Sequence, residues 1–400
     1  MTDCMIPNGY KKTSLGVIPK EWDTIKLKEC FSISAGGDVQ KECFSEFYSP
    51  QYKYPIYSNS LFNHGLYGFT SRPRKKANSI TITGRGSLGH AEYRKTDFDA
   101  IVRLLVLTPK IALYGQFITE YINFRKPFFV ESTGVPQLTA PQIANIQILF
   151  PPLPEQQKIA EIISTWDKAI EKQSQLIEKL ELRKKGLMQQ LLTAKKRLPG
   201  YSDSWKRIKY YNILTETHRS LKWDENELYD LISVRRRSGG VFHRESLYGY
   251  EIKTKNLRPA LEGDFLISKM QIVHGASGVV PKQLSGMKIS GSYIALVAKD
   301  PQELNINYFN LWSQMPLFYR QTFISSNGVH IEKMTFDLET FMSLSMDLPP
   351  IEEQNKIVTI ISSACKDIEL AKQKLELFRQ QKHGLMQQLL TGKKRVNINN

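Results

Sequence analysis

The clearest functional signal in this sequence comes from basic side chains that stand beside aromatic residues and glycines. Such side chains can contact phosphates or read base edges in the major groove of DNA. The net charge of +16 also favours a polyanionic partner. We therefore predict contacts with double-stranded DNA, against the alternative of a merely solvated basic surface. The predicted DNA-binding residues are Arg72, Arg74, Lys75, Lys76, Arg85 and His90 in the first half of the chain, and Arg235, Arg236, Arg237, Lys269, Gln271, His274 and Asn327 in the second.

Enzyme motifs are incomplete. Gly84, Gly86 and Gly89 match the dinucleotide-binding fingerprint, but that site needs a helix to begin in the loop, and the following residues suggest a strand. Residues 150–153 and 348–351 superficially resemble the Pro-Pro motif of amino-methyltransferases but lack its polar first residue and its aromatic residue. No phosphate-binding lysine loop, catalytic triad or metal-ligand cluster is apparent in the sequence. We therefore expect no catalytic residues, no metal and no cofactor.

One long segment occurs twice and must position the basic residues. Residues 151–197 and 349–395 align at a constant offset of 198, and 26 of the 47 positions are identical. Both copies begin with a Pro-Pro pair, carry acidic residues soon after it and close on Lys-Lys-Arg, which suits the two ends of a helix dipole. A duplication of this kind predicts an internal pseudo-two-fold symmetry.

Apolar residues in both copies alternate by four and three positions, which predicts helices packed along a seam. A helix of about 40 residues is about 60 Å long, so a single apolar stripe needs a partner. We expect the two helices to pack antiparallel as a coiled coil; the alternative is that each packs on its own globular domain. We interpret Gly186 and Gly384 as marks of a bend or of a close backbone approach. The predicted seam residues are Ile159, Ile163, Trp166, Ile170, Ile177, Leu180, Ile357, Ile361, Ile368, Leu375 and Phe378.

A globular segment precedes each helix. The two segments open with related signatures around Trp22 and Trp205, which we interpret as core anchors, and beyond those openings they do not align. Short β-like runs at 79–83, 101–107 and 293–297 alternate with turn residues. We predict an α+β fold in which two globular domains are separated by two long antiparallel helices. The predicted limits are 1–152 for the first domain, 153–197 for the central repeat helix, 198–350 for the second domain and 351–400 for the C-terminal repeat helix.

The composition fits a soluble globular protein, with 41% hydrophobic and 24% charged residues. No apolar run approaches the roughly 20 residues that span a bilayer, and the N-terminus shows no signal segment. The four cysteines are scattered and form no Cys-x-x-Cys pair, which fits a reducing compartment. We expect a cytoplasmic protein.

Taken together, these features resemble the specificity (S) subunits of Type I restriction–modification systems. The second globular segment departs from the family pattern of the first, although 326–329 stands roughly where 132–135 stands. The resemblance is carried by Tyr10-Lys-Lys-Thr13, Gly16-Val-Ile-Pro19 and Trp22, by Tyr54-Pro-Ile-Tyr57, by Gly84-Arg-Gly-Ser-Leu-Gly-His90, by residues 132–138 and by the two P-P-[LI]-x-E-Q-x-K-I helix openings.

The resemblance implies that 1–152 and 198–350 are target recognition domains, each reading one half of a bipartite, asymmetric DNA site. It implies helices that set the spacer between the halves and dock two methyltransferase (M) subunits. Restriction (R) subunits would join through that complex. Adenine methylation and ATP-dependent cleavage would then belong to the partners, and this chain would be non-catalytic.

The residues by themselves leave two other functions open. One is a DNA methyltransferase or nuclease with an unrecognised site, which predicts activity from the purified chain. The other is a DNA-binding coiled-coil regulator outside restriction, which predicts no stable complex with a methyltransferase.

Overall fold

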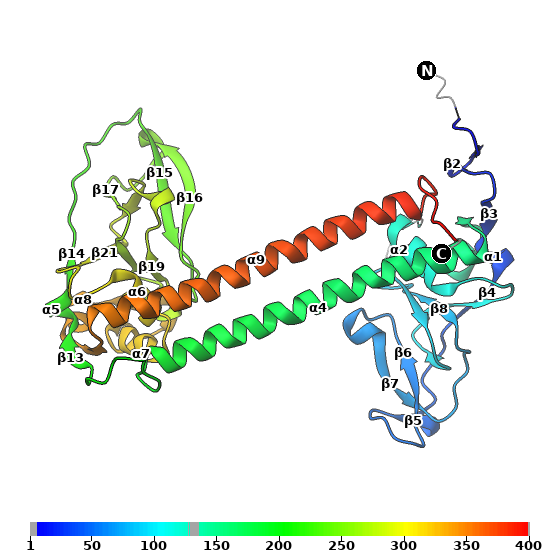
Figure 1. Cartoon of the computed structure of the whole chain (residues 1–400), viewed down its shortest axis with the longest axis horizontal. Coiled ribbons are helices and arrows are strands. Elements are labelled where there is room, and N and C mark those ends of the chain that lie inside the picture. Colours follow the sequence, from blue (N-terminus) through cyan, green and yellow to red (C-terminus); the bar gives the residue numbers. More distant parts are fainter. Residues whose placement is uncertain (1–5, 127, 129–135, 399–400) are drawn as a thin grey trace. The chain divides into compact units, whose positions relative to one another are not determined.

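The computed structural model describes residues 6–126, 128 and 136–398. It divides into two compact units (Figure 1). Unit 1 comprises Met1–Ser174 and Gln373–Asn400, and unit 2 comprises Gln175–Lys372. Each unit therefore contains one globular segment together with part of each long helix, whereas the sequence prediction treated each helix as a domain of its own.

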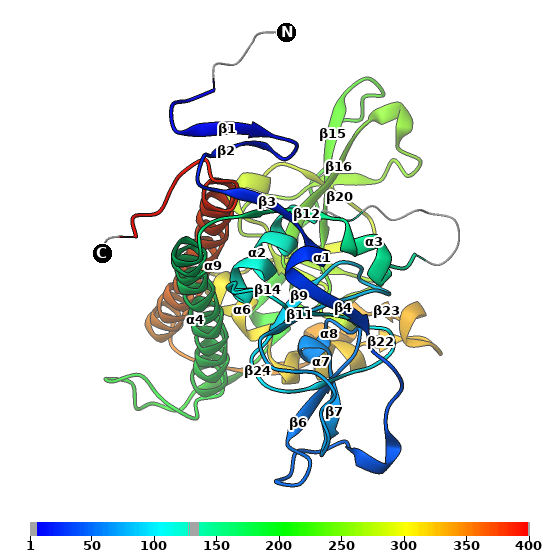
Figure 2. The same ribbon diagram turned by 90° about the vertical axis from the view of Figure 1, so that its right-hand side faces the viewer.

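The globular part of unit 1 is built on two four-stranded sheets. The first sheet is antiparallel, in the order β4-β11-β8-β9, and the second has the order β10-β6-β7-β5. The hairpin of β6 and β7 is the lighter blue pair of strands at the bottom of Figure 2. The strands are β4 (Phe31–Ala35), β5 (Phe44–Ser45), β6 (Tyr54–Tyr57), β7 (Leu66–Thr70), β8 (Ser79–Ile82), β9 (Ala91–Arg94), β10 (Asp99–Ala100) and β11 (Leu105–Pro109).

Smaller elements complete unit 1. The outer strand pairs are β1 with β2 and β3 with β12, both antiparallel. These elements are β1 (Tyr10–Thr13), β2 (Gly16–Pro19), β3 (Asp23–Lys26), β12 (Gln147–Phe150), the helices α1 (Leu27–Cys30), α2 (Gly115–Arg125) and α3 (Ala140–Ala144), and the 3₁₀ turns η1 (Lys41–Cys43) and η2 (Phe62–Gly65).

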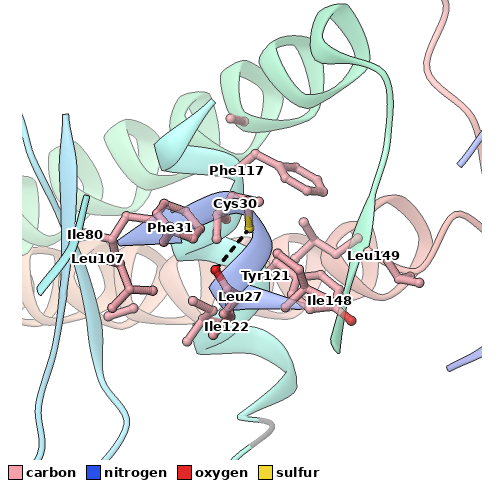
Figure 3. Close-up of a cluster of buried hydrophobic side chains, with 14 of the residues drawn as sticks. Leu27, Cys30, Phe31, Ile80, Leu107, Phe117, Tyr121, Ile122, Ile148 and Leu149 are labelled. Carbon is pink, nitrogen blue, oxygen red and sulfur yellow. Dashed lines mark hydrogen bonds between the residues drawn. The ribbon is translucent and has the colours of Figure 1, made fainter. Parts of the chain in front are cut away.

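The apolar core of unit 1 joins the first sheet to the helices (Figure 3). Strand β8 shows why this sequence forms a central strand: Ile80 and Ile82 enter the core, while Ser79 and Thr81 are buried and form hydrogen bonds instead. Cys30 is also part of this core. Burial raises the pKa of its thiol to about 11, so the thiol stays protonated and packs as an apolar group.

The first sheet and the outer strand pair of unit 2 repeat those of unit 1, although the two globular sequences do not align. The first sheet has the order β14-β21-β18-β19, and the outer pair is β13 with β24. A second sheet has the order β16-β15-β20-β17. The strands are β13 (Lys206–Lys209), β14 (Leu214–Glu216), β15 (Leu228–Val234), β16 (Val241–Tyr248), β17 (Leu257–Pro259), β18 (Phe265–Ser268), β19 (Ser277–Val279), β20 (Lys288–Ser290), β21 (Tyr293–Ala298), β22 (Ser326–Asn327), β23 (Thr335–Phe336) and β24 (Ser345–Leu348).

The helices of unit 2 pack on the first sheet around an aromatic cluster. Tyr210 stacks on Phe341 with ring centroids 4.5 Å apart, and Phe309 and Phe318 meet Phe265 of β18 edge-on. These helices are α5 (Tyr210–Ile213), α6 (Ile306–Trp312), α7 (Pro316–Ile324) and α8 (Leu338–Ser343), with 3₁₀ turns η3 (Gly249–Glu251), η4 (Ile272–His274), η5 (Lys282–Leu284) and η6 (Ile331–Lys333).

The two repeat copies form the long helices α4 (Leu153–Leu191) and α9 (Ile351–Leu389), green and orange-red in Figure 1. Their contacts run antiparallel within each unit. In unit 1, Trp166 meets Phe378 edge-on and Asp167 binds Lys382 at 2.6 Å. The predicted α+β fold with two long helices that pack together is therefore confirmed. Within each unit, both helices also pack on the globular core.

A buried carboxylate near the start of each helix anchors the end of the other helix. In unit 1, Glu155 accepts hydrogen bonds from Trp22 Nε1 at 2.9 Å and from Arg395 Nε at 2.7 Å. In unit 2, Glu353 accepts them from Trp205 Nε1 at 3.0 Å and from the Arg197 guanidinium at 2.9 and 3.0 Å. The arginine of each Lys-Lys-Arg lies beyond its helix and binds the opposite helix.

Two expectations need correction. Residues 101–104 form a turn in which Val102 and Arg103 have positive φ, and strand β11 begins only at Leu105. The sequence pattern misled because a β-branched residue seldom adopts that conformation. The expected close approach at Gly186 and Gly384 is not found either, since a Cβ added at either glycine would meet no described atom within 4 Å. The predicted seam residues are all buried or half-buried.

Candidate DNA interface

The glycine-rich stretch of unit 1 is the hairpin loop between β8 and β9. Its neck is closed by the Thr83 and His90 backbones, with Thr83 N donating to His90 O at 2.9 Å, and His90 N also donates to Thr83 Oγ1 at 2.9 Å. Arg85 is exposed on this loop and donates to Gln137 Oε1 at 3.3 Å. Because a strand follows the loop instead of a helix, the dinucleotide-binding interpretation fails here.

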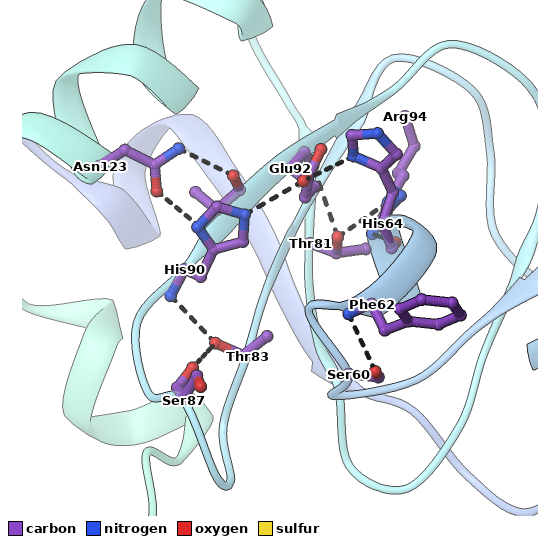
Figure 4. Close-up of polar contacts among 11 residues, drawn as sticks. Ser60, Phe62, His64, Thr81, Thr83, Ser87, His90, Glu92, Arg94 and Asn123 are labelled. Atoms are coloured by element: carbon purple, nitrogen blue, oxygen red, sulfur yellow. Dashed lines mark hydrogen bonds and ion pairs between the residues drawn. The ribbon is translucent and has the colours of Figure 1, made fainter. Parts of the chain in front are cut away.

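A carboxylate behind this loop holds two histidines (Figure 4). Glu92 Oε1 lies 3.1 Å from His90 Nε2 and 3.1 Å from His64 Nδ1. Burial by itself would raise the pKa of Glu92, but the hydrogen bonds from the two histidines and the charge of Arg94 outweigh it and lower the pKa to about 2. The ionised Glu92 thus fixes the orientation of His90, one of the predicted DNA-binding residues.

The basic cluster at 72–76 has mixed surroundings. Arg74 donates to the buried carboxylate of Asp99 at 2.9 and 3.0 Å, and Lys75 donates to Ser34 Oγ at 2.9 Å. Both side chains therefore have partners within the fold. Arg72 is exposed, and Lys76 is exposed beside Asp97. The structure gives Arg74 a role in stability, and DNA contact by the four residues stays a prediction.

In unit 2 the loop between β18 and β19 stands where the glycine-rich loop stands in unit 1. It contains Lys269, Gln271 and His274, and the turn after β15 brings Arg236 to it. Arg236 Nε donates to Gln271 Oε1 at 2.7 Å. The Arg237 amide donates to the His274 carbonyl at 2.7 Å. Residues far apart in the sequence thus gather on one loop system.

A third loop of unit 2 joins this group through Glu332. Its carboxylate lies 2.9 Å from the Arg236 guanidinium and 3.1 Å from His274 Nε2. Asn327 lies on the same connection, in the short pairing of β22 with β23, and is exposed. Arg235 points elsewhere, with its guanidinium 4.1 Å from the ring centre of Phe242. Five of the seven predicted residues of unit 2 therefore share this loop system, and Arg237 reaches it through its backbone.

Sequence reasoning missed the carboxylates that organise both loop systems. Glu92 and Glu332 are single acidic residues, and no spacing pattern connects them with the histidines and the arginine that they bind. The exposed position of Arg103 in a turn was also missed, because residues 101–107 looked like a strand. The 132–135 segment of the resemblance lies outside the described residues.

Comparison with known proteins gives the family. The model of the type I restriction modification DNA specificity domain matches residues 19–182. A putative type I restriction enzyme specificity subunit of Methanocaldococcus jannaschii is 23% identical over 97% of both chains. A putative type I specificity subunit of Mycoplasma pneumoniae is 32% identical over 35% of this chain and 39% of its own. Residues 19–182 thus match a type I restriction modification DNA specificity domain, and the chain is similar to type I specificity subunits over nearly its whole length.

Solved structures share the fold. The S subunit of a type I restriction–modification system from M. genitalium aligns over 92% of this chain and 96% of its own, with a TM-score of 0.57 and 14% identity. A chain from a structure of the type I R-M system, solved to explain complex assembly and conformational transition, aligns over 94% and 99%, with a TM-score of 0.59 and 15% identity. At these identities the likeness speaks for architecture, not for individual contacts.

Two further findings concern metal ligands and membrane spans among the described residues. In the part of the chain that the structure describes, no group of three His, Cys, Asp or Glu side chains is placed to hold a metal ion. None of the described helices combines the length and apolar character that crossing a membrane requires.

Proposed function

We propose that the two units read the two halves of a bipartite, asymmetric DNA site. The observation that carries this proposal is the loop between the third and fourth strands of the first sheet. Both units present this loop from the same sheet order, but unit 1 offers Arg85 and His90, whereas unit 2 offers Lys269, Gln271 and His274. Equivalent positions with different hydrogen-bonding groups suit different base sequences.

We further propose that the long helices set the spacer and dock two methyltransferase subunits, through which restriction subunits join. The buried carboxylate anchors at both helix ends support a stiff frame. Exposed apolar side chains on both long helices support the docking of a partner. Leu182 of α4 is 70% exposed and Leu377 of α9 is 56% exposed. The methyl donor, ATP and metal ions would then be bound by the partner subunits.

Exchange of one recognition domain tests whether each unit reads its own half-site. Residues 210–348 are replaced by the equivalent segment of a relative, and methylated sites are mapped in cells that also carry the methyltransferase partner. One half-site should change and the other should stay. If both halves change, the two units do not read independently.

Labelled S-adenosylmethionine and mixed-sequence DNA test the absence of catalysis in this subunit. The purified chain should transfer no label and should cut no DNA, whereas the complex with its methyltransferase partner should methylate. Transfer by the chain alone would support the rival function of an enzyme with an unrecognised site.

A further inference from the structure

Three loops of unit 1 meet at one exposed tip. Asn59 joins them, because its Oδ1 accepts a hydrogen bond from Gly84 N at 2.7 Å and its Nδ2 donates to the Val102 carbonyl at 2.5 Å. Leu61 and His64 also line the same cavity as the end of the glycine-rich loop. We call this feature the unit 1 tip, and it consists of residues 58–65, 84–89 and 101–104.

Four residues of the unit 1 tip that are not glycine have a positive φ, and Val102 is the least suited to it. Asn63, His64, Val102 and Arg103 have φ values of 47°, 53°, 55° and 59°. L-residues avoid this left-handed region, and a β-branched valine avoids it most. Such conformations persist only where the surroundings enforce them, and they are concentrated at functional sites.

Hydrogen bonds hold the turn at 58–65 in this shape. The Ser58 amide donates to the Gly65 carbonyl at 2.8 Å, and Arg94 Nη2 donates to the His64 carbonyl at 3.0 Å. The His64 ring is fixed by Glu92. A Cβ on Gly65 would lie 2.7 Å from the Ser58 carbonyl oxygen, so only glycine fits there. The turn is therefore a rigid support.

This support presents an apolar ring to solvent. Phe62 is 86% exposed and points away from the His90, Glu92 and His64 network (Figure 4). Val102 is half exposed on the same tip, and Arg85 and Arg103 are exposed on its two other loops. The side chain of Phe62 thus gains little from packing within the chain, although the fold holds its backbone firmly. Its neighbours on the tip are cations that suit phosphates.

We propose that Phe62 inserts between base pairs of the duplex read by unit 1, with Arg85 and Arg103 at the flanking phosphates. The occupant is double-stranded DNA, because the tip combines an apolar wedge with cations. Phenylalanine wedges of this kind unstack a base step and bend the duplex. A rigid support matters, because a flexible loop would yield before the base stack opens. This inference rests on the proposed function and adds DNA distortion to it.

The test uses the full complex with its methyltransferase partner and the target found by methylation mapping. 2-Aminopurine, an adenine analogue that brightens when unstacked, is placed at successive positions of the half-site read by unit 1, leaving out the adenine that the methyltransferase itself flips from the stack. Fluorescence should rise at one step with the native complex. Phe62→Ala should abolish that rise and weaken binding by roughly tenfold, as expected for one stacked ring. Arg85→Ala and Arg103→Ala should each remove one phosphate contact. Each should therefore reduce the slope of the log binding constant against log salt concentration by about one.

Matched controls separate the outcomes. Phe47→Ala removes another exposed phenylalanine of unit 1, 78% exposed and outside the tip, and should change neither fluorescence nor affinity. Phe62→Leu should keep part of the fluorescence rise. A rise that survives Phe62→Ala, or specific binding and methylation by the native complex without any rise, would overturn the wedge and leave the proposed function standing. Failure of the native complex to bind the mapped site specifically would overturn both the wedge and the proposed function.

Discussion

Replacing Arg395 with alanine should leave a buried carboxylate of unit 1 without its charge partner. The Glu155 side chain is 0% exposed, and its two hydrogen-bond donors are the Arg395 guanidinium and the Trp22 indole. After the substitution the indole remains, but the negative charge stays inside the protein without a cation. The expected result is a less stable unit 1 with an unchanged fold.

The magnitude follows from the burial of the two partners. Removing one member of a buried ion pair costs about 3–5 kcal/mol. The Arg395 side chain is 33% exposed, so water can enter part of the vacated space, and we expect the lower end, about 3 kcal/mol. In a domain the size of unit 1, each kcal/mol lowers Tm by about 2–4 °C. The Tm of unit 1 should therefore fall by about 6–12 °C.

Thermal and urea unfolding measure this loss. Arg379→Ala, on the helix that precedes Arg395, is the matched control, because Arg379 lies 3.9 Å from Glu376 with both side chains more than half exposed, and it should have little effect. Adding Glu155→Gln to Arg395→Ala should restore part of the stability, since no buried charge then remains. A loss below about 1 kcal/mol, or a double variant less stable than Arg395→Ala, would refute the reasoning.

Three further predictions concern other parts of the subunit. The pKa of Glu92 is lowered to about 2, so its contribution to stability should be present above the unfolded pKa of 4.5 and be lost as pH falls towards 2; Glu92→Gln should flatten this acid limb in urea titrations. Arg74→Ala should destabilise unit 1 by about 3 kcal/mol in urea unfolding, because it leaves the buried Asp99 carboxylate unpaired. One heptad inserted after Ile170 and one at the matching point after Ile368 should lengthen each helix by about 10 Å and shift the methylated half-sites by about three base pairs, although a rotation of about 100° around the DNA weakens binding; an active variant that keeps the original spacer would contradict a helical ruler.

The long helices were predictable because their information is periodic and repeated. The alternation of apolar residues defines a seam, and the duplication shows that both copies need it. The role of the arginine at the end of each copy was not predictable from the sequence. Arg197 and Arg395 looked like partners of the helix dipole, whereas each binds a glutamate of the opposite helix. That contact depends on antiparallel packing, which brings the end of one copy to the start of the other.

The globular parts were predictable in class but not in detail. Short strands at 79–83 and 293–297 follow from local β propensity and match β8 and β21 closely. The turn at 101–104 did not follow, because tertiary contacts enforce a conformation that Val102 disfavours locally. The common sheet order of the two units was also hidden. A buried strand needs only apolar residues of suitable size, so the sequences can diverge without losing the topology.

This tolerance explains how one chain can present two different surfaces. The groups that anchor each globular part to the helices are the same in kind: a tryptophan, an arginine and a buried glutamate. The exposed side chains of the loops after the third strand of each first sheet share no such restriction, although Leu88 and Ile272 of these loops do reach the cores. Substitutions in these loops can change hydrogen-bonding groups at little cost to packing, whereas substitutions in the anchors leave a buried charge unpaired. Selection for stability therefore keeps the anchors alike in both copies, and the exposed loops are free to differ.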